Sequence, residues 1–253
     1  MLKIGIVGTG YFGEIHIKVL LKLKKLFKIV GFFDINKKRS EEISNKYQIP
    51  FLDLNNLIQK SELINITSKT DTHFELIKLA LKEKKHLFVE KPICETLSEI
   101  KYIKELKKSL DVKIQVGFIE RFNPAFLSLS SIKFSAKHIK AIRKTSLLNR
   151  NKKNSIVKDL MIHDIDIINT IINSYPKKIT VLKKQKNYIN CKIIFKNGSI
   201  AELIAERTNA KNKKLERKMT IQTNDNREIV LDFVKQKTSI NTNGDILFLK
   251  SNQ

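Results

Sequence analysis

Hydrophobic and polar positions alternate in a regular order over the first 117 residues. Short apolar runs typical of buried strands, beginning with Ile4–Val7, are each followed by a polar turn and an amphipathic helical pattern. The runs Ile29–Phe33, Leu63–Ile66 and His86–Val89 repeat this order, and Val112–Gly117 ends it. Strands that alternate with helices predict a parallel, doubly wound sheet, so the first half of the chain is expected to form an α/β domain.

The helical patterns between these runs have recognisable starts. Helices are predicted from Asn36 to about Lys46, over Leu54–Gln59, over Phe74–Lys84 and from Thr96 to about Leu110. Asn36 is a suitable N-cap, and Thr96 with Glu99 forms a capping box. Before the third helix, Asp71 or Thr72 is expected to act as the cap.

The pattern changes after Phe118, where short alternating segments replace the strand–helix order. One helix is expected from about Ile156 to Asn173, and Asn197-Gly198 predicts a hairpin turn. Strands are predicted over Lys178–Leu182, Tyr188–Phe195, Ile200–Glu206, Met219–Gln222, Glu228–Phe233 and Ile246–Leu249, with polar loops over Asn209–Lys214 and Thr242–Gly244. The second half is therefore expected to be an α+β domain with an open, mainly antiparallel sheet.

A glycine-rich turn separates the first predicted strand from the first helix. Gly8 allows a tight turn off the strand, Gly10 allows a pyrophosphate to approach the backbone, and Gly13 allows close packing of helix on strand. Tyr11 and Phe12 open the helix, whose N-terminal N–H groups favour phosphate. Strand, glycine turn, helix and strand in this order predict a dinucleotide-binding Rossmann domain.

An acid follows the second strand. Asp34 stands twenty-one residues after Gly13, which suits a carboxylate that binds the ribose hydroxyls of a dinucleotide. An acid at this position repels a 2′-phosphate, so NAD is predicted in preference to NADP. Lys37, Lys38 and Arg39 follow closely and are expected to soften that preference.

Polar residues also follow the next two strands. Thr67 and Ser68 come after one strand, and Glu90, Lys91 and Pro92 come after the other. Ligands of open α/β sheets bind at the carboxyl ends of the strands, so Thr67, Ser68, Glu90 and Lys91 are predicted to lie beside the cofactor. The alternatives are a polar turn and a solvated loop lysine.

The helix of the second half carries a polar stripe. Asp159 and His163 are four residues apart and Asp166 is three further on, so they share one face. Such a stripe meets a ligand, a partner or water, because polar groups are not buried unpaired. Asp159, His163 and Asp164 are conceivable metal ligands, but no further Cys or His completes a set, so no metal is predicted.

The junction of the two halves contains Arg121 and Asn123. Arg121 is a candidate for bidentate binding of a phosphate or carboxylate. The alternative is an ion pair, either with Glu120 or between the two halves.

Composition adds one strong feature, a formal net charge of +24 over 253 residues. The basic residues are mostly lysines scattered along the chain, without an arginine-rich block with aromatics, so no specific nucleic-acid partner is expected. A positive surface still suits an anionic cofactor or a nucleotide-linked substrate.

The remaining composition points to the cytoplasm. No apolar run reaches the ~18–20 residues of a membrane span, and the chain starts directly in a strand, so neither a span nor a signal peptide is expected. Cys94 and Cys191 make neither a disulfide framework nor a metal pair.

Three segments together resemble the Gfo/Idh/MocA oxidoreductase family. They are GIVGTGYFG at Gly5–Gly13, EKP at Glu90–Pro92 and DLMIHDID at Asp159–Asp166. The last of these and GFIERFNPA at Gly117–Ala125 look most like the branch that contains UDP-N-acetylglucosamine 3-dehydrogenase. The chain departs from the family in being shorter than typical members and in carrying Phe118 where His is frequent.

The resemblance implies a fold, an activity and residue roles. It implies an NAD-binding Rossmann domain over residues 1–118 and a substrate-binding domain over 119–253, whose sheet builds homo-oligomers. The reaction implied is hydride transfer between a sugar or nucleotide-sugar hydroxyl and nicotinamide. The implied catalytic residues are Lys91 at the reacting hydroxyl, His163 as general acid/base and Asp159 as an orienting group; Lys91 and His163 are expected to converge over the nicotinamide.

Other functions stay open at this point. Some members of the family use bound NAD for transient oxidation during glycoside cleavage, and others oxidise inositols or free sugars. A non-catalytic NAD sensor or a basic nucleic-acid-binding protein is the remaining alternative.

Overall fold

The computed structural model describes residues 1–146, 155–208, 215–242 and 244–249. The chain divides into two compact units, Met1–Gly117 and Phe118–Gln253. Each unit has its own sheet and its own core, and each is described separately below.

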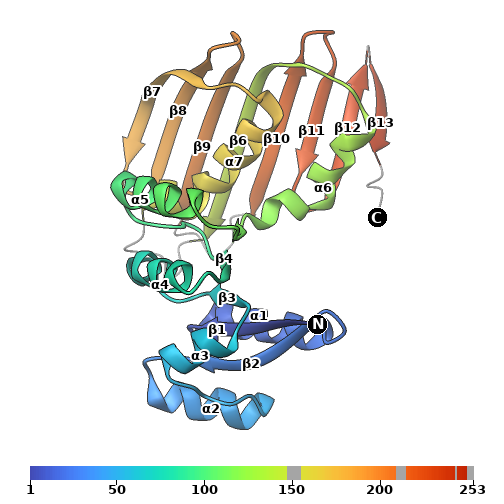
Figure 1. Ribbon diagram of the computed structural model, residues 1–253. Coiled ribbons are helices and arrows are strands. Elements are labelled where there is room, and N and C mark those ends of the chain that lie inside the picture. Colours follow the sequence, from blue (N-terminus) through green and yellow to red (C-terminus); the bar gives the residue numbers. More distant parts are fainter. Residues whose placement is uncertain (147–154, 209–214, 243, 250–253) are drawn as a thin grey trace. The chain divides into compact units, whose positions relative to one another are not determined.

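The N-terminal unit is built on a parallel five-stranded sheet, as the sequence predicted (Figure 1). Its strand order is β2-β1-β3-β4-β5. After β2 the chain returns to the other side of β1, so β3 lies beside β1 and the direction of winding reverses there. The strands are β1 (Leu2–Val7), β2 (Phe27–Phe33), β3 (Leu63–Ile66), β4 (His86–Val89) and β5 (Ile114–Val116). The carboxyl ends of β1 and β3 therefore meet at the reversal, which is where open α/β sheets bind ligands.

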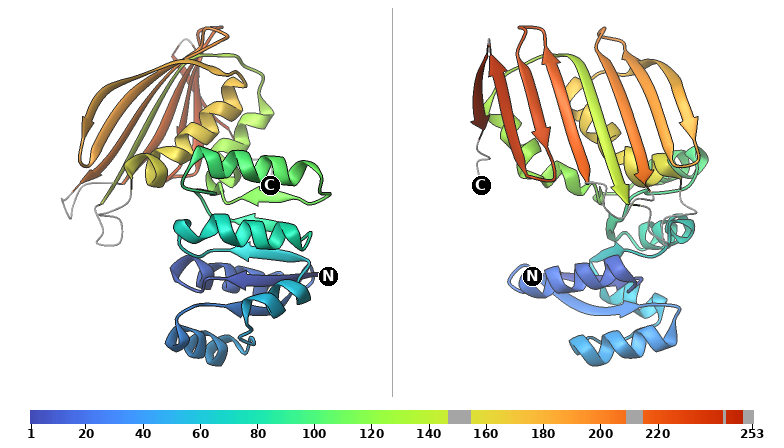
Figure 2. Two further views of the ribbon diagram at one scale, coloured as in Figure 1. Left: turned by 60° about the vertical axis from the view of Figure 1, so that its left-hand side comes forward. Right: turned by 180° about the vertical axis from the view of Figure 1, so that it is seen from behind.

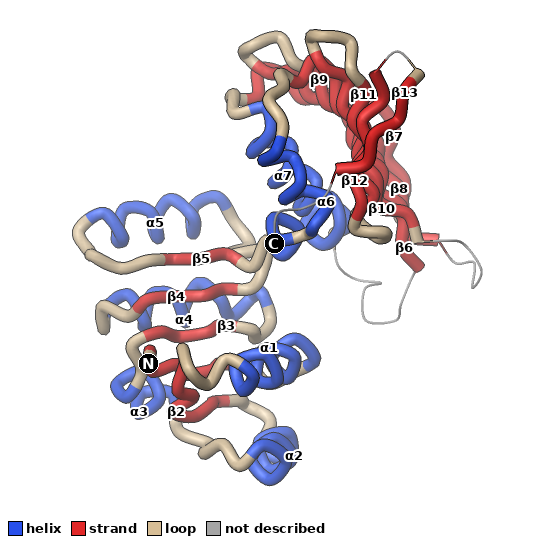
Figure 3. The backbone as a smooth tube through the Cα atoms, turned by 90° about the vertical axis from the view of Figure 1, so that its right-hand side faces the viewer, coloured by secondary structure: helices blue, strands red, loops and turns tan. Residues whose placement is uncertain are grey.

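Helices cover both faces of this sheet (Figure 3). They are α1 (Tyr11–Lys22), α2 (Lys37–Tyr47), α3 (Leu54–Lys60), α4 (Thr70–Lys82) and α5 (Leu97–Lys108). Successive side chains of a strand point to opposite faces. Ile4 and Ile6 of β1 accordingly pack in one cluster with α1 and α2, while Val7 packs in a second cluster with α3, α4 and α5.

The helix starts confirm most of the sequence predictions. The Asn36 side chain accepts from the backbone of Arg39, and the capping box of Thr96 and Glu99 is present. The predicted start of α4 was wrong, because the helix begins at Thr70 after the N-cap Lys69. The Thr72 hydroxyl instead donates to the Lys69 carbonyl from inside the first turn.

The C-terminal unit is an open eight-stranded sheet in the order β13-β12-β11-β10-β6-β9-β8-β7. Among the described strands, β6 and β9 pair in parallel and the other neighbours are antiparallel. The strands are β6 (Ala136–Ser146), β7 (Pro176–Gln185), β8 (Tyr188–Phe195), β9 (Ile200–Thr208), β10 (Glu216–Thr223), β11 (Glu228–Asp232), β12 (Lys237–Thr242) and β13 (Asp245–Leu249). The predicted mainly antiparallel sheet is confirmed.

Helical segments lie on one face of this sheet (Figure 3), and the right-hand view of Figure 2 shows the other face. They are η1 (Ile119–Phe122), α6 (Pro124–Leu127), η2 (Ser128–Ser131), the π-helical segment η4 (Val157–Met161) and α7 (Ile162–Ile172). Ile167 and Ile168 of α7 and Ile139 of β6 belong to the single core cluster of this unit's described residues. The helix predicted from Ile156 is thus split into a π-helical turn and an α-helix.

Two strands were missed at the level of sequence. In β6 lysines alternate with buried residues such as Ile139 and Ala141, and β12 buries only Thr238 and Ile240. Both segments are rich in residues that are infrequent in strands, so their pairing with neighbours decides their structure. The predicted loop at Asn209–Lys214 and residue 243 lie outside the described residues.

Candidate functional site

The glycine turn has the backbone that a phosphate site requires. Gly8 has φ +88°, and a side chain there would place Cβ 2.6 Å from the Ser68 backbone. A Cβ on Gly13 would lie against the Gly8 carbonyl, so both positions require glycine. At Gly10, by contrast, nothing lies within 4 Å of the place that a Cβ would occupy, so the backbone is open to a ligand there. Gly10 is also the N-cap of α1.

Thr67 locks this turn to the neighbouring strand. Its buried hydroxyl donates to the Gly8 carbonyl over 2.6 Å, and its backbone N–H donates to Val7. Ser68 follows, and its hydroxyl lies 2.7 Å from that of Thr72. Thr67 therefore shapes the turn with its hydroxyl, and both Thr67 and Ser68 line the pocket described next.

A pocket of about 870 Å³ opens beside the turn. It is bordered by the ends of β1, β2 and β3 and by the first turns of α2 and α4, through residues that include Gly8, Gly10, Asp34, Arg39, Thr67 and Ser68. The open N-terminus of α1 adjoins it, where Tyr11 and Phe12 are exposed. The N-terminal end of a helix dipole makes such a site favourable for phosphate.

Asp34 is held at the edge of this pocket by its neighbours. One carboxylate oxygen accepts from the Thr9 backbone N–H over 2.7 Å and from the Thr9 hydroxyl over 2.8 Å. The other oxygen accepts from the Asn36 backbone N–H over 2.9 Å. A carboxylate oxygen can accept two hydrogen bonds, so the second oxygen retains capacity for a ribose hydroxyl.

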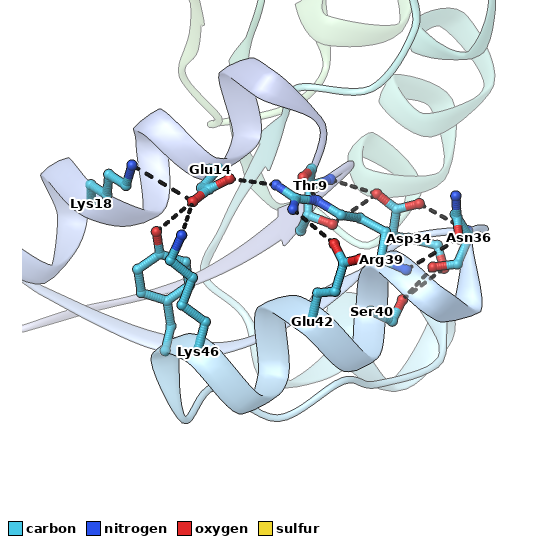
Figure 4. Close-up of polar contacts among 10 residues, drawn as sticks. Thr9, Glu14, Lys18, Asp34, Asn36, Arg39, Ser40, Glu42 and Lys46 are labelled. Atoms are coloured by element: carbon cyan, nitrogen blue, oxygen red, sulfur yellow. Dashed lines mark hydrogen bonds and ion pairs between the residues drawn. The ribbon is translucent and has the colours of Figure 1, made fainter.

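Arg39, beside Asp34, is held by three partners (Figure 4). Its Nε donates to the Thr9 carbonyl over 2.8 Å, Nη2 pairs with Glu14 over 2.5 Å and Nη1 pairs with Glu42 over 3.2 Å. Glu14 raises the pKa of Arg39 further above its ordinary value. The guanidinium is therefore charged and fixed against α1 and α2.

The Glu90–Lys91–Pro92 turn is anchored by a polar chain from α1. Asn65 Nδ2 lies 3.0 Å from His16 Nδ1, and His16 Nε2 lies 3.2 Å from Glu90 Oε1. The second oxygen of Glu90 accepts from the Lys91 backbone N–H over 3.2 Å. Glu90 therefore positions the backbone that carries Lys91, and the Lys91–Pro92 peptide bond is cis.

His73 joins two of the turns that surround the site. Its side chain is buried, with Nδ1 3.0 Å from the Pro92 carbonyl and Nε2 3.1 Å from the Ser68 carbonyl. The ring thus bridges the turn after β3 and the turn after β4. No role was assigned to His73 from the sequence.

In the C-terminal unit, the three acids of the DLMIHDID segment each meet an arginine. Asp159 accepts from Arg207 over 2.8 Å, and Asp166 is bound by both Nε and Nη2 of Arg121, at 2.7 and 2.5 Å. Asp159 lies in a π-helical turn, a type of helix defined by i→i+5 hydrogen bonds. The prediction that Asp159 and His163 share a face assumed a regular α-helix, and that spacing does not apply to this turn. His163 is half-buried in the first turn of α7.

The third acid, Asp164, lies at the centre of a buried charge cluster. Arg143 Nε and Nη2 bind its two oxygens over 2.9 and 2.8 Å, and Nη1 binds Glu120 over 2.8 Å. Burial raises the pKa of Asp164, and the Arg143 charge opposes that rise. Burial alone would lower the pKa of Arg143, but the two carboxylates outweigh it and raise that pKa.

Arg121 and Asn123 have structural partners within the same unit. Arg121 pairs with Asp166, and its guanidinium lies 5.4 Å from the centre of the Phe118 ring. Asn123 caps α6 with its Oδ1 and donates through Nδ2 to the Phe233 carbonyl and to Glu120. An ion pair of Arg121 was the alternative from sequence, but its partner is Asp166.

Of the predicted cofactor residues, Gly8, Gly10, Asp34, Thr67 and Ser68 line one pocket, whereas Gly13, Glu90 and Lys91 do not line it. In the C-terminal unit, Asp159 and His163 lie on adjacent turns. Sequence reasoning missed Glu14, His16, His73 and Arg143. The signals present in the sequence were a Glu and a His on the helix after the glycine turn and an arginine within a lysine-rich strand.

Two further properties concern the described residues only. They contain no group of three His, Cys, Asp or Glu side chains arranged to hold a metal ion, and both cysteines are free and buried. Burial raises the pKa of the Cys94 thiol to about 11. None of the described helices combines the length and the apolar character that crossing a membrane requires.

Comparison with known proteins agrees with this geometry. Residues 2–118 match the profile of the family described as oxidoreductase family, NAD-binding Rossmann fold, GFO_IDH_MocA. The chain is 24% identical over 213 residues to UDP-N-acetylglucosamine 3-dehydrogenase of Acidithiobacillus ferrooxidans, covering 81% of this chain and 67% of the relative. It is 30% identical over 186 residues to glucose-6-phosphate 3-dehydrogenase of Bacillus subtilis, covering 66% of this chain and 53% of the relative.

Solved structures extend the fold similarity to the whole chain. The A. ferrooxidans enzyme superposes with a TM-score of 0.90 at 21% identity, over 100% of this chain and 83% of that one. Levoglucosan dehydrogenase in complex with NADH superposes with a TM-score of 0.86 at 16% identity, over 98% of this chain and 79% of that one. In sequence, the chain spans 53 to 67% of the length of the curated relatives it matches.

The matched profile coincides with the unit that contains the glycine turn, Asp34 and the pocket. Over residues 2–118, which coincide with its N-terminal unit, the chain therefore matches the Gfo/Idh/MocA oxidoreductase family with its NAD-binding Rossmann fold.

Proposed function

We propose that this protein is an NAD-dependent dehydrogenase that oxidises a hydroxyl group of a sugar or nucleotide-linked sugar. The observation that carries the proposal is the pocket of about 870 Å³ that joins the glycine turn to Asp34. Relatives named as dehydrogenases of UDP-N-acetylglucosamine, inositol and glucose-6-phosphate support the substrate class. C3 of UDP-N-acetylglucosamine is the first candidate for the oxidised position.

The residues of the pocket fit the cofactor. Gly10 leaves room for a pyrophosphate, and the first-turn N–H groups of Phe12 and Gly13 can donate to it. Asp34 would accept hydrogen bonds from the adenosine ribose. NAD, when bound, supplies nicotinamide C4 as the hydride acceptor.

Lys91 would stabilise negative charge on the reacting oxygen. The turn that carries it is fixed by Glu90 and by the His73 contact to Pro92. A fixed ammonium group near the substrate hydroxyl stabilises its deprotonated, alkoxide form. Lys91 therefore makes the carbon-bound hydrogen easier to release as hydride.

His163 would accept the proton of the substrate hydroxyl. Histidine suits reversible proton transfer because its ordinary pKa lies near neutrality. Asp159, fixed by Arg207, would orient the substrate or His163. That Lys91 and His163 act on one substrate molecule stays a prediction.

Substrate binding is assigned to Arg121 and Asn123 with Asp159. Arg121 pairs with Asp166 in this structure, so a substrate phosphate or carboxylate would compete with that carboxylate. The proposal divides the chain into a cofactor domain over residues 1–118 and a domain for substrate and self-association over 119–253. A homo-oligomer formed through the open sheet and a cytoplasmic location belong to the same proposal.

The test is turnover by the purified chain. NAD is mixed with UDP-sugars, inositols and free sugars, and NADH is followed by absorbance. We expect one substrate class to yield NADH, and His163→Ala and Lys91→Met each to lower kcat by roughly 10²–10⁴-fold. His138→Ala and Lys107→Met serve as matched controls outside the site and should keep full activity.

Other results would favour the alternatives. Formation of no NADH above the His163→Ala background would remove the dehydrogenase mechanism. Glycoside release without net NADH would identify an NAD-using glycosidase. Binding of DNA or RNA with a steep salt dependence, unaffected by His163→Ala, would support a nucleic-acid-binding protein.

A further inference from the structure

We propose that Glu14 determines cofactor selectivity: by holding Arg39 against α1, it denies the pocket a cation for the 2′-phosphate of NADP. This inference rests on the proposed NAD pocket. It assigns a role to a residue that is neither part of the glycine turn nor Asp34, the acid that follows β2.

The first observation is that each of the three side-chain nitrogens of Arg39 already donates a hydrogen bond within the protein. Nε, Nη2 and Nη1 bond to the Thr9 carbonyl, to Glu14 and to Glu42 respectively. A guanidinium binds phosphate through a pair of parallel N–H donors. Here the contacts to Glu14 and Glu42 hold both terminal nitrogens in one orientation, so the guanidinium is not free to turn toward a phosphate.

The second observation is that Glu14 is a strong anchor. Lys46 Nζ and Tyr47 Oη lie 2.8 and 2.7 Å from its Oε1, and Lys18 Nζ lies at 3.6 Å (Figure 4). Its side chain is only 17% exposed. Lys46, followed by Tyr47 and Arg39, holds the pKa of Glu14 far below its ordinary value of 4.5. Glu14 therefore keeps its charge throughout the neutral range.

The third observation is the position of this anchor relative to the pocket. Asp34 and Arg39 both line the pocket and both bond to Thr9, so they flank the same backbone residue. A basic side chain near the acid is how such pockets accept a 2′-phosphate. Arg39 stands in that neighbourhood but is bound to Glu14.

The experiment measures binding, not turnover. Dissociation constants for NADH and NADPH are determined by fluorescence titration for the natural protein, for Glu14→Ala and for Glu41→Ala. Glu41 is exposed on α2 and does not line the pocket, so its substitution removes the same charge without releasing Arg39. We expect Glu14→Ala to improve NADPH binding relative to NADH by about tenfold, the worth of one charge-assisted hydrogen bond, and Glu41→Ala to leave the ratio unchanged.

A second pair of variants tests the mechanism. In Glu14→Ala/Arg39→Ala the gain should disappear, because the released guanidinium is its source. Arg39→Ala alone should affect both cofactors equally, and this variant supplies the test if Glu14→Ala does not fold. The inference is overturned if the ratio is unchanged in Glu14→Ala, if the gain persists without Arg39, or if Arg39→Ala weakens NADPH selectively. Failure of the natural protein to bind NADH would instead remove the proposed function on which the inference rests.

Discussion

Glu14 in the N-terminal unit and Arg143 in the C-terminal unit are each the centre of a charge cluster, but the two clusters differ in burial and in function. Glu14 gathers Arg39 and Lys46 at the edge of a pocket, on side chains that reach solvent. Arg143 gathers Glu120 and Asp164 where each of the three side chains is at most 7% exposed. The first cluster can lose a partner by substitution without leaving a fully buried charge, and the second cannot.

This difference separates ligand specificity from architecture. Exposed ion pairs contribute little to stability, so the Glu14 cluster is free to be tuned for binding. A buried pair that loses one partner is strongly destabilising, so the Arg143 cluster fixes the position of α7 and of η1 on the sheet. Because α7 carries His163, the buried cluster would support the proposed chemistry indirectly.

The largest effect is expected from breaking the buried cluster. Arg143→Met should lower the free energy of unfolding by about 3–5 kcal/mol, because buried Asp164 loses the cation that binds both of its oxygens, while Glu120 keeps the more distant Arg217 as a cationic partner. The deficit should shrink as the pH falls and the carboxyl group of Asp164, whose pKa is raised by burial, takes up a proton. Chemical denaturation at several pH values measures both effects.

Lys144→Ala is the matched control for Arg143→Met. Lys144 is the next residue on β6, and its ion pair with Glu216 is partly exposed. Its loss should change stability by about 1 kcal/mol or less. If the two substitutions lowered the free energy of unfolding equally, burial would not explain the different importance of the two ion pairs for stability.

The next effect concerns the buried link in the N-terminal unit. His73→Leu should lower the free energy of unfolding by about 1–3 kcal/mol, because the Ser68 and Pro92 carbonyls lose their shared partner. It should also weaken NADH binding, since Ser68 lines the pocket. His86→Leu, on β4, is the control, and the prediction fails if both variants bind NADH as the natural protein does.

A pair of glycines sharpens the contrast between binding and architecture. Gly10 has φ −62° and open space around it, so Gly10→Ala should keep stability but weaken NADH binding by about tenfold or more, the worth of one charge-assisted phosphate contact. Gly198 has φ +87° in a turn of the C-terminal unit, so Gly198→Ala should cost about 1–2 kcal/mol of stability. NADH titration and thermal unfolding of both variants should give opposite patterns.

The smallest effect is a pH dependence of the Glu14 cluster. The folded-state pKa of Glu14 is depressed below its ordinary value of 4.5. Its contribution to stability is therefore fully present above about pH 4.5 and is lost as the pH falls toward the folded-state pKa. The stability difference between the natural protein and Glu14→Gln should be below about 1 kcal/mol, constant near neutrality, and smaller in acid. A difference that grows in acid would contradict the assignment.

The sequence alone determined the N-terminal unit and the place of its pocket. Strand, glycine turn, helix and acid are contiguous from Ile4 to Asp34, so local pattern and spacing carry the information. The caps at Asn36 and Thr96 were predicted for the same reason, because a cap acts within one helical turn. The start of α4 was missed, because Lys69 makes no side-chain cap.

The tertiary structure decided which charged groups are partners. Arg143 meets Glu120 and Asp164, which are 23 and 21 residues away, and Arg207 meets Asp159 at a separation of 48. It also decided that β6 and β12 are strands, since their pattern is too polar to predict it and their neighbours supply the pairing. Likewise, Arg39 looked available to a phosphate in the sequence, and only the fold brings Glu14 to it from 25 residues away. Charge pairing depends on distance in space, which spacing along the chain does not give.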